Sequence, residues 1–415
     1  MSRSLPVPTA ESSSKHAPRV LMMAAGTGGH VFPALAVAQA LEQQGATVHW
    51  LGTLMGMEND LLADTGFVYH AINMQGLRRN GMGRLLKAPG TLLKATLACV
   101  KIIRSNHIDV VVGFGGYVTA PGGLAAKICK VPLLIHEQNA IAGMSNRYLA
   151  KMANRVLQAF PNTFRENKPD GLVTVGNPVR EAIVELPPPE ARIDPKDQSP
   201  LRLLVIGGSL GAQVLNQTIA PTLKLLENQP SQHRPPTALN TQPNTQRWQV
   251  RHQCGRNNLT DTQAVYDQAD LQHTQYEVTP FIADMAEAYA WADVIVCRAG
   301  ALTVTEVATA GLLAVFVPLP HAVDDHQTAN ARWLANQDAA ILTPQPQLTA
   351  EHLAQTLGNL DRATILAKAK KARALAQPDA TAKVAALVLA ACQTKPMLNV
   401  PSANRAASNL PPNET

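Results

Sequence analysis

Residues 294–331 read VIVCRAGALTVTEVATAGLLAVFVPLPHAVDDHQTANA, and the fold predicted for the chain follows from this stretch. Residues 294–296 are an apolar run typical of a buried strand, residues 302–310 fit a helix, and residues 313–317 form a second apolar run. Gly311 marks the end of the helix, because glycine commonly follows the last helical residue. Strand, helix and strand in this order predict one unit of a parallel α/β sheet.

The helix expected at residues 302–310 contains the first candidate site. Val304 and Val307 share one face, which leaves Thr303 and Glu306 together on another. A helix that opens from a glycine turn after a strand binds anions, because its free N–H groups and the positive end of its dipole point at the ligand. A carboxylate one turn further along accepts hydrogen bonds from sugar hydroxyls. This geometry favours a diphosphate at the helix start with ribose at Glu306; an ordinary strand–helix turn with a solvated glutamate is the alternative.

Composition and charge bound the class of protein. Of 415 residues, 46% are hydrophobic and 16% are charged, as in a globular protein long enough for two domains. The net charge of +6 is uneven, since residues 19–180 hold 16 Lys and Arg against 8 Asp and Glu, and residues 181–415 hold 18 against 21. We therefore expect the first half to face nucleic acid, an anionic membrane or a phosphorylated substrate. Aromatic residues, at 4%, are too few to favour stacking on single-stranded nucleic acid.

Cysteine spacing and apolar runs indicate a reducing compartment without membrane spans. The five cysteines lie far apart, which is typical of neither a disulfide framework nor a zinc site. Residues 1–18 lack the apolar core of a secretory signal and are expected to be a disordered tail. Arg298 and Glu306 interrupt the longest apolar stretch, so no segment is expected to cross a membrane.

The two halves of the chain repeat one order of elements. The first half opens with a strand at residues 19–25 and the loop GTGGH from Gly26; the second opens with a strand at residues 201–206 and the loop GGSLGA from Gly207. The proline-rich residues 187–200 are expected to link the halves. The sequence predicts an α/β protein of two doubly wound, Rossmann-like domains with ligand sites facing each other across a cleft.

Both glycine loops lack the residues of common nucleotide cofactor sites. GTGGH lacks the third glycine of the dinucleotide fingerprint, and no acid ends the next strand, which argues against a dehydrogenase. No P-loop lysine follows either loop, which argues against an ATPase. No Asp-x-Asp occurs, which favours a diphosphate neutralised by a helix end and arginine over one bridged by metal. Arg180 and Arg298 are candidates, with ordinary surface arginines as the alternative; no cofactor and no metal are expected.

Histidines mark the candidate catalytic positions. His30 follows the first glycine loop at a helix start, where it can meet substrate or simply cap the helix. His136 and Glu137 end a strand, where a catalytic pair and a structural pair look the same in sequence. Residues 76–87, GLRRNGMGRLLK, mix basic and apolar side chains on one loop and suit an anionic membrane surface through Arg78, Arg79, Arg84 and Lys87. In the following helix Leu93, Leu97 and Val100 repeat at core spacing, so we expect them to be packed.

With these motifs in place, the chain closely resembles the bacterial N-acetylglucosaminyltransferases that convert lipid I to lipid II in peptidoglycan synthesis. The matching motifs keep their order over roughly residues 19–390: GTGGHVFPALAVA from Gly26, GFGGYVTAPGGLAA from Gly113, HEQNAIAGMSNRYLA from His136, GNPVR from Gly176, GGSLGA from Gly207, FIADMAEAYAWADVIVCRAGALTVTEVATAG from Phe281 and HQTANA from His326. Three departures are visible: Ala25 where the family usually has glycine, a long polar loop at residues 230–246, and extra tails.

The resemblance implies a GT-B fold and an inverting transfer of GlcNAc from UDP-GlcNAc to the 4-hydroxyl of the muramyl sugar on lipid I. By motif it implies these donor contacts: Thr27, Gly28, Gly29, Asn139, Arg180, Ser209, Ile282, Ala301, Leu302, Thr303, Val304, Thr305, Glu306 and Gln327. His30 is the first candidate for the base, with His136 and Glu137 behind it. The expected partners are the two substrates, an anionic membrane at the cytoplasmic face of the inner membrane and other cell-wall or division proteins, with no nucleic acid.

The resemblance also gives a division of the chain. We expect a tail at residues 1–18, an acceptor- and membrane-facing domain at 19–186, the linker at 187–200, a donor-binding domain at 201–362, C-terminal helices packing back toward the first domain at 363–393, and a loose tail at 394–415. Two other functions stay open: a related GT-B enzyme that glycosylates another lipid, and a non-catalytic nucleotide-sugar-binding subunit. A donor and acceptor screen separates the first, and a single-turnover assay the second.

Overall fold

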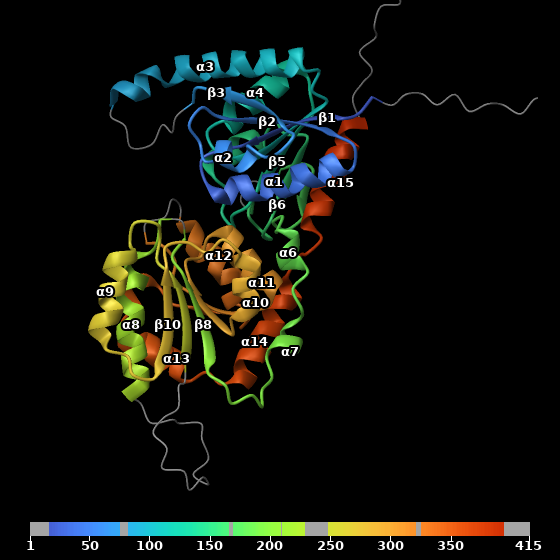
Figure 1. Cartoon of the computed structure of the whole chain (residues 1–415). Coiled ribbons are helices and arrows are strands. Elements are labelled where there is room, and N and C mark those ends of the chain that lie inside the picture. Colours follow the sequence, from blue (N-terminus) through green and yellow to red (C-terminus); the bar gives the residue numbers. More distant parts are fainter. Residues whose placement is uncertain are drawn as a thin grey trace, which may run out of the picture.

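The computed structural model describes residues 16–74, 82–165, 169–208, 210–228, 248–320 and 325–393, with the backbone alone for residues 82–88. Figure 1 shows two α/β lobes, one above the other, each built around one sheet. The loop expected at residues 230–246, both tails beyond residues 16–393, Ser209, Arg78 and Arg79 lie outside the described residues, as do the side chains of Arg84 and Lys87.

The first lobe is a parallel sheet with the strand order β3-β2-β1-β4-β5-β6-β7. Its strands are β1 Arg19–Ala24, β2 Thr47–Thr53, β3 Val68–Ile72, β4 Val110–Gly115, β5 Leu133–Glu137, β6 Arg155–Gln158 and β7 Leu172–Thr174. Its helices are α1 Gly28–Gln43, α2 Glu58–Leu62, α3 Met82–Ser105, α4 Thr119–Cys129 and α5 Met144–Leu149. Strands β1 and β4 are apolar and buried on both faces, because helices cover both sides of the sheet.

The second lobe repeats the plan with the strand order β10-β9-β8-β11-β12-β13. Its strands are β8 Leu201–Ile206, β9 Trp248–Gln253, β10 Thr274–Thr279, β11 Val294–Cys297, β12 Leu313–Phe316 and β13 Ile341–Leu342. Its helices are α8 Gln213–Asn228, α9 Leu259–Ala269, α10 Met285–Trp291, α11 Ala301–Ala310, α12 His326–Ala335, α13 Ala350–Gly358 and α14 Arg362–Leu375. The doubly wound, two-lobed α/β architecture predicted from the sequence is confirmed.

One hydrophobic core joins the lobes. Phe160, which follows β6, packs edge-to-face on Trp333 of α12 with ring centroids 5.1 Å apart. Ile183, on the short helix α6 Glu181–Val184, is buried in the same cluster as Val304 and Phe316 of the second lobe. The lobes therefore share buried apolar surface and not only a linker.

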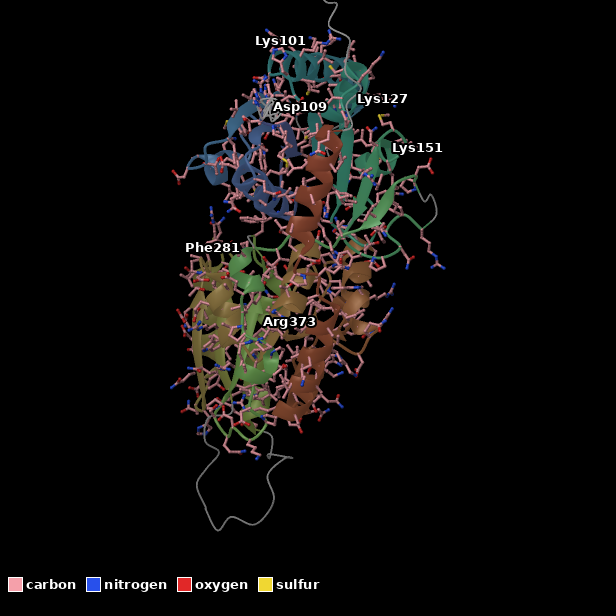
Figure 2. All side chains as sticks on the ribbon, turned by 90° about the vertical axis from the view of Figure 1, so that its right-hand side faces the viewer. Lys101, Asp109, Lys127, Lys151, Phe281 and Arg373 are labelled. Carbon is pink, nitrogen blue, oxygen red and sulfur yellow. The ribbon has the colours of Figure 1, made fainter. Side chains whose placement is uncertain are left out.

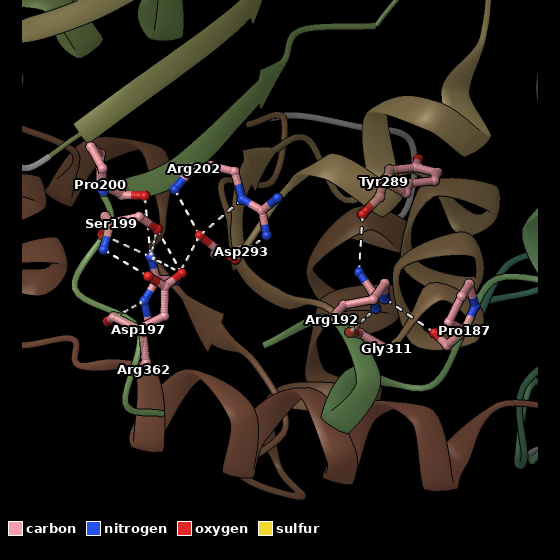
Figure 3. Close-up of polar contacts among 10 residues, drawn as sticks. All are labelled: Pro187, Arg192, Asp197, Ser199, Pro200, Arg202, Tyr289, Asp293, Gly311 and Arg362. Atoms are coloured by element: carbon pink, nitrogen blue, oxygen red, sulfur yellow. Dashed lines mark hydrogen bonds and ion pairs between the residues drawn. The ribbon is translucent and has the colours of Figure 1, made fainter. Parts of the chain in front are cut away.

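The proline-rich segment at residues 187–200 is ordered against the second lobe. Its helix α7 Pro189–Arg192 ends at Arg192, whose guanidinium donates to the carbonyls of Pro187, Tyr289, Ala310 and Gly311. Near its other end, Arg362 donates to the carbonyls of Asp197, Ser199 and Pro200 and pairs with the fully buried carboxylate of Asp293. Figure 3 shows both anchors. The segment is thus fixed along its length by arginine hydrogen bonds, unlike a flexible tether.

The last two helices divide between the lobes. Helix α14 packs beside α11 and α7, whereas α15 Ala380–Gln393 buries Val384, Ala385 and Val388 in the core that α1 also covers (Figure 1). Between α14 and α15 the chain returns to the first lobe at Gln377, which packs so closely on Gly176 that a Cβ added there would lie 2.8 Å from the Cβ of Gln377; the φ of Gly176 is +84°. By length and composition residues 362–393 pass as a membrane span, yet α14 and α15 pack against the two lobes.

Two local expectations are corrected. Helix α1 begins at Gly28 and not near Phe32, because the N–H groups of His30 and Val31 already bond to the carbonyl of Thr27. Leu93 and Leu97 were expected in the core, but they are 61% and 59% exposed on the outer face of α3. The buried face of α3 is instead formed by Ala95, Cys99 and Ile103. The spacing of Leu93 and Leu97 therefore predicted the wrong face of the helix as buried.

Candidate functional site

The start of helix α11, in the second lobe, has the backbone geometry that we expect of an anion-binding site. Gly300 occupies the N-cap with φ −60° and ψ 145° and provides no side-chain acceptor, so the first-turn N–H groups point out of the helix beyond the end of β11. The N–H of Val304 bonds back to the carbonyl of Gly300 at 2.9 Å. The donors left for a ligand are those of Ala301, Leu302 and Thr303.

The side chains of Val304 and Thr305 are buried, and the ligand contacts that the motif implied at these two positions stay a prediction. Val304 is fully buried, and Thr305 is 4% exposed. The Thr305 hydroxyl donates to the carbonyl of Ala301 at 2.9 Å and accepts from Asn177 Nδ2 at 3.1 Å. Their place in the motif therefore reflects packing of α11 on its sheet and on the first lobe, while Thr303 and Glu306 face outward as expected.

Glu306 lies at the contact between the lobes. Its Oε1 accepts from Arg180 Nη2 at 2.9 Å, and its Oε2 accepts from the hydroxyl of Tyr289 at 3.0 Å. The Arg180 guanidinium lies 5.8 Å from the ring centroid of Phe32 on α1, so it bridges the first helix of one lobe and α11 of the other. The Glu306 side chain keeps 12% of its surface exposed, which leaves an accessible edge for a ligand hydroxyl.

Tyr289 and Gln253 are functional candidates that the sequence reasoning missed. Gln253 ends β9 and pairs with both sides of Gly208, accepting from its N–H at 3.2 Å and donating to its carbonyl at 3.0 Å. The glycine loop at residues 207–212 is therefore braced by the neighbouring strand. Tyr289 belongs to the motif from Phe281, but no sequence signal pairs it with Glu306.

The first glycine loop is held by a buried carboxylate and by the loop after β4. Glu58 is fully buried and accepts from the N–H of Gly26 at 3.3 Å and from the N–H of Thr53 at 2.8 Å. An added Cβ at Gly116 would lie 2.3 Å from the carbonyl oxygen of Ala25, so the loop that starts at Gly113 passes directly over the first loop. Thr27, Gly28 and Gly29 are exposed or half-buried at the start of α1, where Thr27 provides no side-chain cap.

His30 lies between these two loops. Its Nδ1 is 3.2 Å from Thr27 Oγ1, and a Cβ at Gly115 would lie 2.6 Å from its ring, so only glycine fits beside the imidazole. Burial lowers the pKa of His30 below its ordinary 6.5; Glu137 and the Ala25 backbone oppose this shift, and His326 of the second lobe adds to it. The neutral form of the imidazole is therefore favoured, and Glu137 of the first lobe and His326 of the second lobe lie near enough to act on its charge.

His136 and Glu137 are buried structural residues in this arrangement. His136 is fully buried with Nε2 2.9 Å from the carbonyl of Gly176 and Nδ1 3.2 Å from Gln138 Nε2, so its ring donates from Nε2 and accepts at Nδ1. Burial lowers the pKa of His136 to about 4. Glu137 accepts from the N–H groups of Asn139 and Gly143 and from two side-chain amides. Both side chains are buried and hydrogen-bonded within the protein, which argues against the catalytic role considered for the pair.

Three further donor contacts implied by the motifs are engaged near the cleft. Asn139 donates to Glu137 and accepts from Asn330 of α12 at 3.3 Å, across the two lobes. Gln327 accepts from the N–H of Leu319 at 2.9 Å, and Ile282 is partly buried against the core that joins the lobes. Arg298, the alternative diphosphate partner, donates through Nη1 to the carbonyls of Val317 and Pro318 and so supports the end of β12.

Comparison with known proteins agrees with this arrangement. The glycosyltransferase family 28 N-terminal domain matches residues 20–158, and the glycosyltransferase family 28 C-terminal domain matches residues 202–386. A UDP-N-acetylglucosamine–N-acetylmuramyl-(pentapeptide) pyrophosphoryl-undecaprenol N-acetylglucosamine transferase of Psychrobacter cryohalolentis is 60% identical over 372 residues, 89% of this chain and 98% of the relative. A protein of the same name from Acinetobacter baumannii strain SDF is 50% identical over 381 residues, 91% of this chain and 98% of the relative.

Solved structures show the same architecture. The crystal structure of Acinetobacter baumannii MurG superposes with a TM-score of 0.75 at 46% identity, over 90% of this chain and 99% of that one. CalG4, the calicheamicin glycosyltransferase, has a TM-score of 0.61 at 15% identity and covers 91% of this chain, which is a likeness of fold alone.

Proposed function

The chain belongs to glycosyltransferase family 28, and on this premise we propose that it transfers GlcNAc from UDP-GlcNAc to the muramyl 4-hydroxyl of undecaprenyl-diphospho-MurNAc-pentapeptide, lipid I, to give lipid II. The observation on which the site depends is that Arg180 contacts both lobes, with its guanidinium bonded to Glu306 of α11 and 5.8 Å from the ring of Phe32 on α1. The GT-B resemblance seen in the sequence is confirmed.

UDP-GlcNAc binds the second lobe in this proposal. The first-turn N–H groups of α11 hold the diphosphate, because they carry partial positive charge and have no acceptor from the N-cap. Glu306 accepts a ribose hydroxyl at its exposed edge, and the braced loop at residues 207–212 lies beside the nucleoside. Arg180 adds positive charge next to the diphosphate from the first lobe side.

The chemistry is an inverting displacement at the anomeric carbon of GlcNAc. The acceptor hydroxyl loses its proton to a base as it attacks, and the departing UDP gains charge that the helix start and Arg180 stabilise. His30 is the base in this proposal, since its ring is neutral at pH 7 and lies at the start of α1, facing the second lobe. The sugar passes through a transition state with oxocarbenium character, as at other glycosyl centres.

The decisive experiment measures UDP release from UDP-GlcNAc in the presence and absence of a lipid I analogue. We expect release that depends on the acceptor and a disaccharide product of inverted configuration. Equal release with other lipid acceptors favours a related GT-B enzyme. UDP-GlcNAc binding without turnover of any acceptor identifies a non-catalytic binding subunit and contradicts the proposal.

We further propose that the outer face of α3 and α4 rests on the anionic cytoplasmic leaflet, where lipid I is presented. Leu93, Leu97 and Ile128 are all more than half exposed there, beside the exposed residues Lys101 and Lys127. Figure 2 shows Lys101 and Lys127 at the end of the first lobe farthest from the second lobe. Apolar side chains ringed by lysines suit a headgroup surface, because the apolar groups enter the bilayer while the charges meet anionic lipid.

Vesicle sedimentation tests this surface together with the basic residues outside the described part of the chain. Leu93→Gln with Leu97→Gln is expected to weaken binding to phosphatidylglycerol vesicles even at low salt. Replacement of Arg78, Arg79, Arg84 and Lys87 by serine is expected to remove the salt-sensitive part of binding. Lys370→Ser, on the exposed face of α14, is the matched control. Equal vesicle binding by parent and variants rejects this membrane surface without affecting the donor site.

A further inference from the structure

Buried Tyr289 contacts Glu306, the acidic side chain placed at the proposed donor site. Its hydroxyl donates to Glu306 Oε2 at 3.0 Å, and the residue is 1% exposed in the core that joins the lobes. Burial and the Glu306 charge raise the pKa of Tyr289 well above its ordinary value, so the phenol keeps its proton at physiological pH. It is therefore a permanent donor to the carboxylate.

The position of Tyr289 is set by its surroundings. Helix α10 begins at Asp284, whose side chain accepts from the N–H of Glu287, and the carbonyl of Tyr289 accepts from Arg192 at 3.2 Å. The ring is enclosed by core side chains and the backbone is held by α7, so the hydroxyl has a fixed direction. A donor fixed in this way orients its acceptor, because the acceptor side chain has more rotational freedom.

The two oxygens of Glu306 have different donors. Arg180 bonds Oε1 at 2.9 Å and Tyr289 bonds Oε2 at 3.0 Å, so the plane of the carboxylate is defined by one contact on each oxygen. Each carboxylate oxygen accepts more than one hydrogen bond, so both retain capacity for a ligand hydroxyl. The carboxylate is thus oriented before the nucleotide arrives, which lowers the entropy cost of binding it.

We propose that Tyr289 is a positioning residue that sets the preference of the donor site for ribonucleotides by orienting Glu306. This inference rests on the proposed function, in which Glu306 accepts a ribose hydroxyl. A site built to bond a substrate hydroxyl discriminates strongly against an analogue that lacks it, provided the acceptor is held in place. Loss of the Tyr289 hydroxyl is therefore expected to weaken ribonucleotide binding more than deoxyribonucleotide binding.

Calorimetry with UDP, 2′-deoxy-UDP and 3′-deoxy-UDP tests the proposal on the full chain. The parent is expected to bind UDP more tightly than at least one deoxy analogue. Tyr289→Phe is expected to lower UDP affinity about three- to tenfold, because Glu306 loses one of its two donors but keeps Arg180. The affinity for that deoxy analogue is expected to change little. Tyr276→Phe, in the edge strand β10, removes the hydroxyl of a ring that packs on Tyr266 and is expected to leave the ratio of UDP to deoxy-UDP affinity unchanged.

Glu306→Asp is a second variant that leaves the core intact. It keeps the charge but shortens the side chain, so the carboxylate loses its reach to the Tyr289 hydroxyl, and we expect the same loss of discrimination. If Tyr289→Phe weakens the binding of all three nucleotides equally, Tyr289 does not position Glu306. The same conclusion follows if Glu306→Asp still prefers UDP over the deoxy analogues as strongly as the parent does. If instead the parent binds all three nucleotides equally and Glu306→Ala does not change UDP affinity, the donor placement itself fails and the role of Tyr289 fails with it.

Discussion

The His30 side chain is half-buried, and burial of its imidazole lowers its pKa below 6.5. A general base must be unprotonated, so kcat/KM is expected to stay level above pH 6.5 and to fall as the pH drops through the lowered pKa. His30→Gln is expected to reduce kcat by about 10²–10⁴, the usual worth of a positioned base, because glutamine hydrogen-bonds but does not take a proton at this pH. Steady-state kinetics across pH 5–8 provides the measurement.

The His30→Gln variant also separates a catalytic role of His30 from a binding role. UDP-GlcNAc affinity and melting temperature are expected to remain near those of the parent, since the imidazole bonds to Thr27 and the Ala25 backbone at the surface of the first lobe and glutamine keeps this bonding capacity. A variant that keeps kcat within a few-fold and mainly raises the acceptor KM makes His30 a binding residue. His136 and Glu137 would not replace it, because both are buried and hydrogen-bonded.

His136 gives a prediction about stability. Its pKa is lowered to about 4 in the folded chain by burial, against about 6.5 when unfolded, so between these values the unfolded chain binds more protons. Its neutral form therefore imposes no cost above pH 6.5, and stability is lost as the pH falls from 6.5 to about 4, by about 3 kcal/mol in all. His136→Gln is expected to have a shallower fall in unfolding free energy over this range, measured by denaturant titration. If the unfolding free energies of the parent and the variant fall equally with pH, His136 is not buried in its neutral form.

At the scale of elements, α11 shows what the sequence predicts well. Glycines at both ends bounded it, and the spacing of Val304 and Val307 separated its buried face from Thr303 and Glu306, as observed. The spacing in α3 was misleading, because Leu93 and Leu97 are apolar yet exposed, and periodicity cannot tell a core face from an apolar surface. The donor motif also did not show which of its side chains are exposed, since Val304 and Thr305 belong to it but are buried.

Helix α11 ends on a contact that the linker provides. Arg192 donates to the carbonyls of Ala310 and Gly311, which have no partner inside the helix, and burial lowers the pKa of its guanidinium. Arg192→Ala is expected to destabilise the chain by about 2–3 kcal/mol, because several half-buried carbonyls lose a charged donor. Lys370→Ala, exposed on α14, is the control for chemical denaturation. A loss below 0.5 kcal/mol would show that the linker is not fixed by Arg192.

At the scale of the whole molecule, the contacts between the lobes could not be predicted. Residues 139 and 330, or 180 and 306, are far apart in the sequence, and a single chain gives no signal that pairs them. Glycine loops and strand order indicated where the two sites open, since both follow local rules. Which side chains lie exposed at the contact between the lobes depends on tertiary packing. Glu137 is buried and accepts hydrogen bonds within the protein, whereas Glu306 keeps an exposed edge.

Asn330 is one of the side chains that hydrogen-bond across the two lobes. It is fully buried on α12, its Oδ1 accepts from the N–H of Ala140 at 2.8 Å, and its Nδ2 donates to the carbonyl of Ala299 and to Asn139 Oδ1. In Asn330→Ala the N–H of Ala140 on the first lobe and the carbonyl of Ala299 on the second lobe each lose a hydrogen-bond partner. Each such group costs about 1–3 kcal/mol, so we expect a loss of about 2–4 kcal/mol that falls on the contact between the lobes.

Scanning calorimetry with UDP-GlcNAc titration measures the consequence. The parent is expected to unfold in one transition, because Phe160 and Trp333 pack across the lobes in a shared core. In Asn330→Ala that coupling weakens, so the transition is expected to separate into two, and kcat/KM to fall more than tenfold as the loops at Asn139 and Ala299 lose their common anchor. Asn336→Ala, at the exposed C-cap of the same helix, is the matched control and is expected to change stability by less than about 0.5 kcal/mol. If Asn330→Ala instead unfolds in a single transition and keeps the parent's kcat/KM, the apolar core alone couples the two lobes. The hydrogen bonds of Asn330 would then contribute nothing to that coupling.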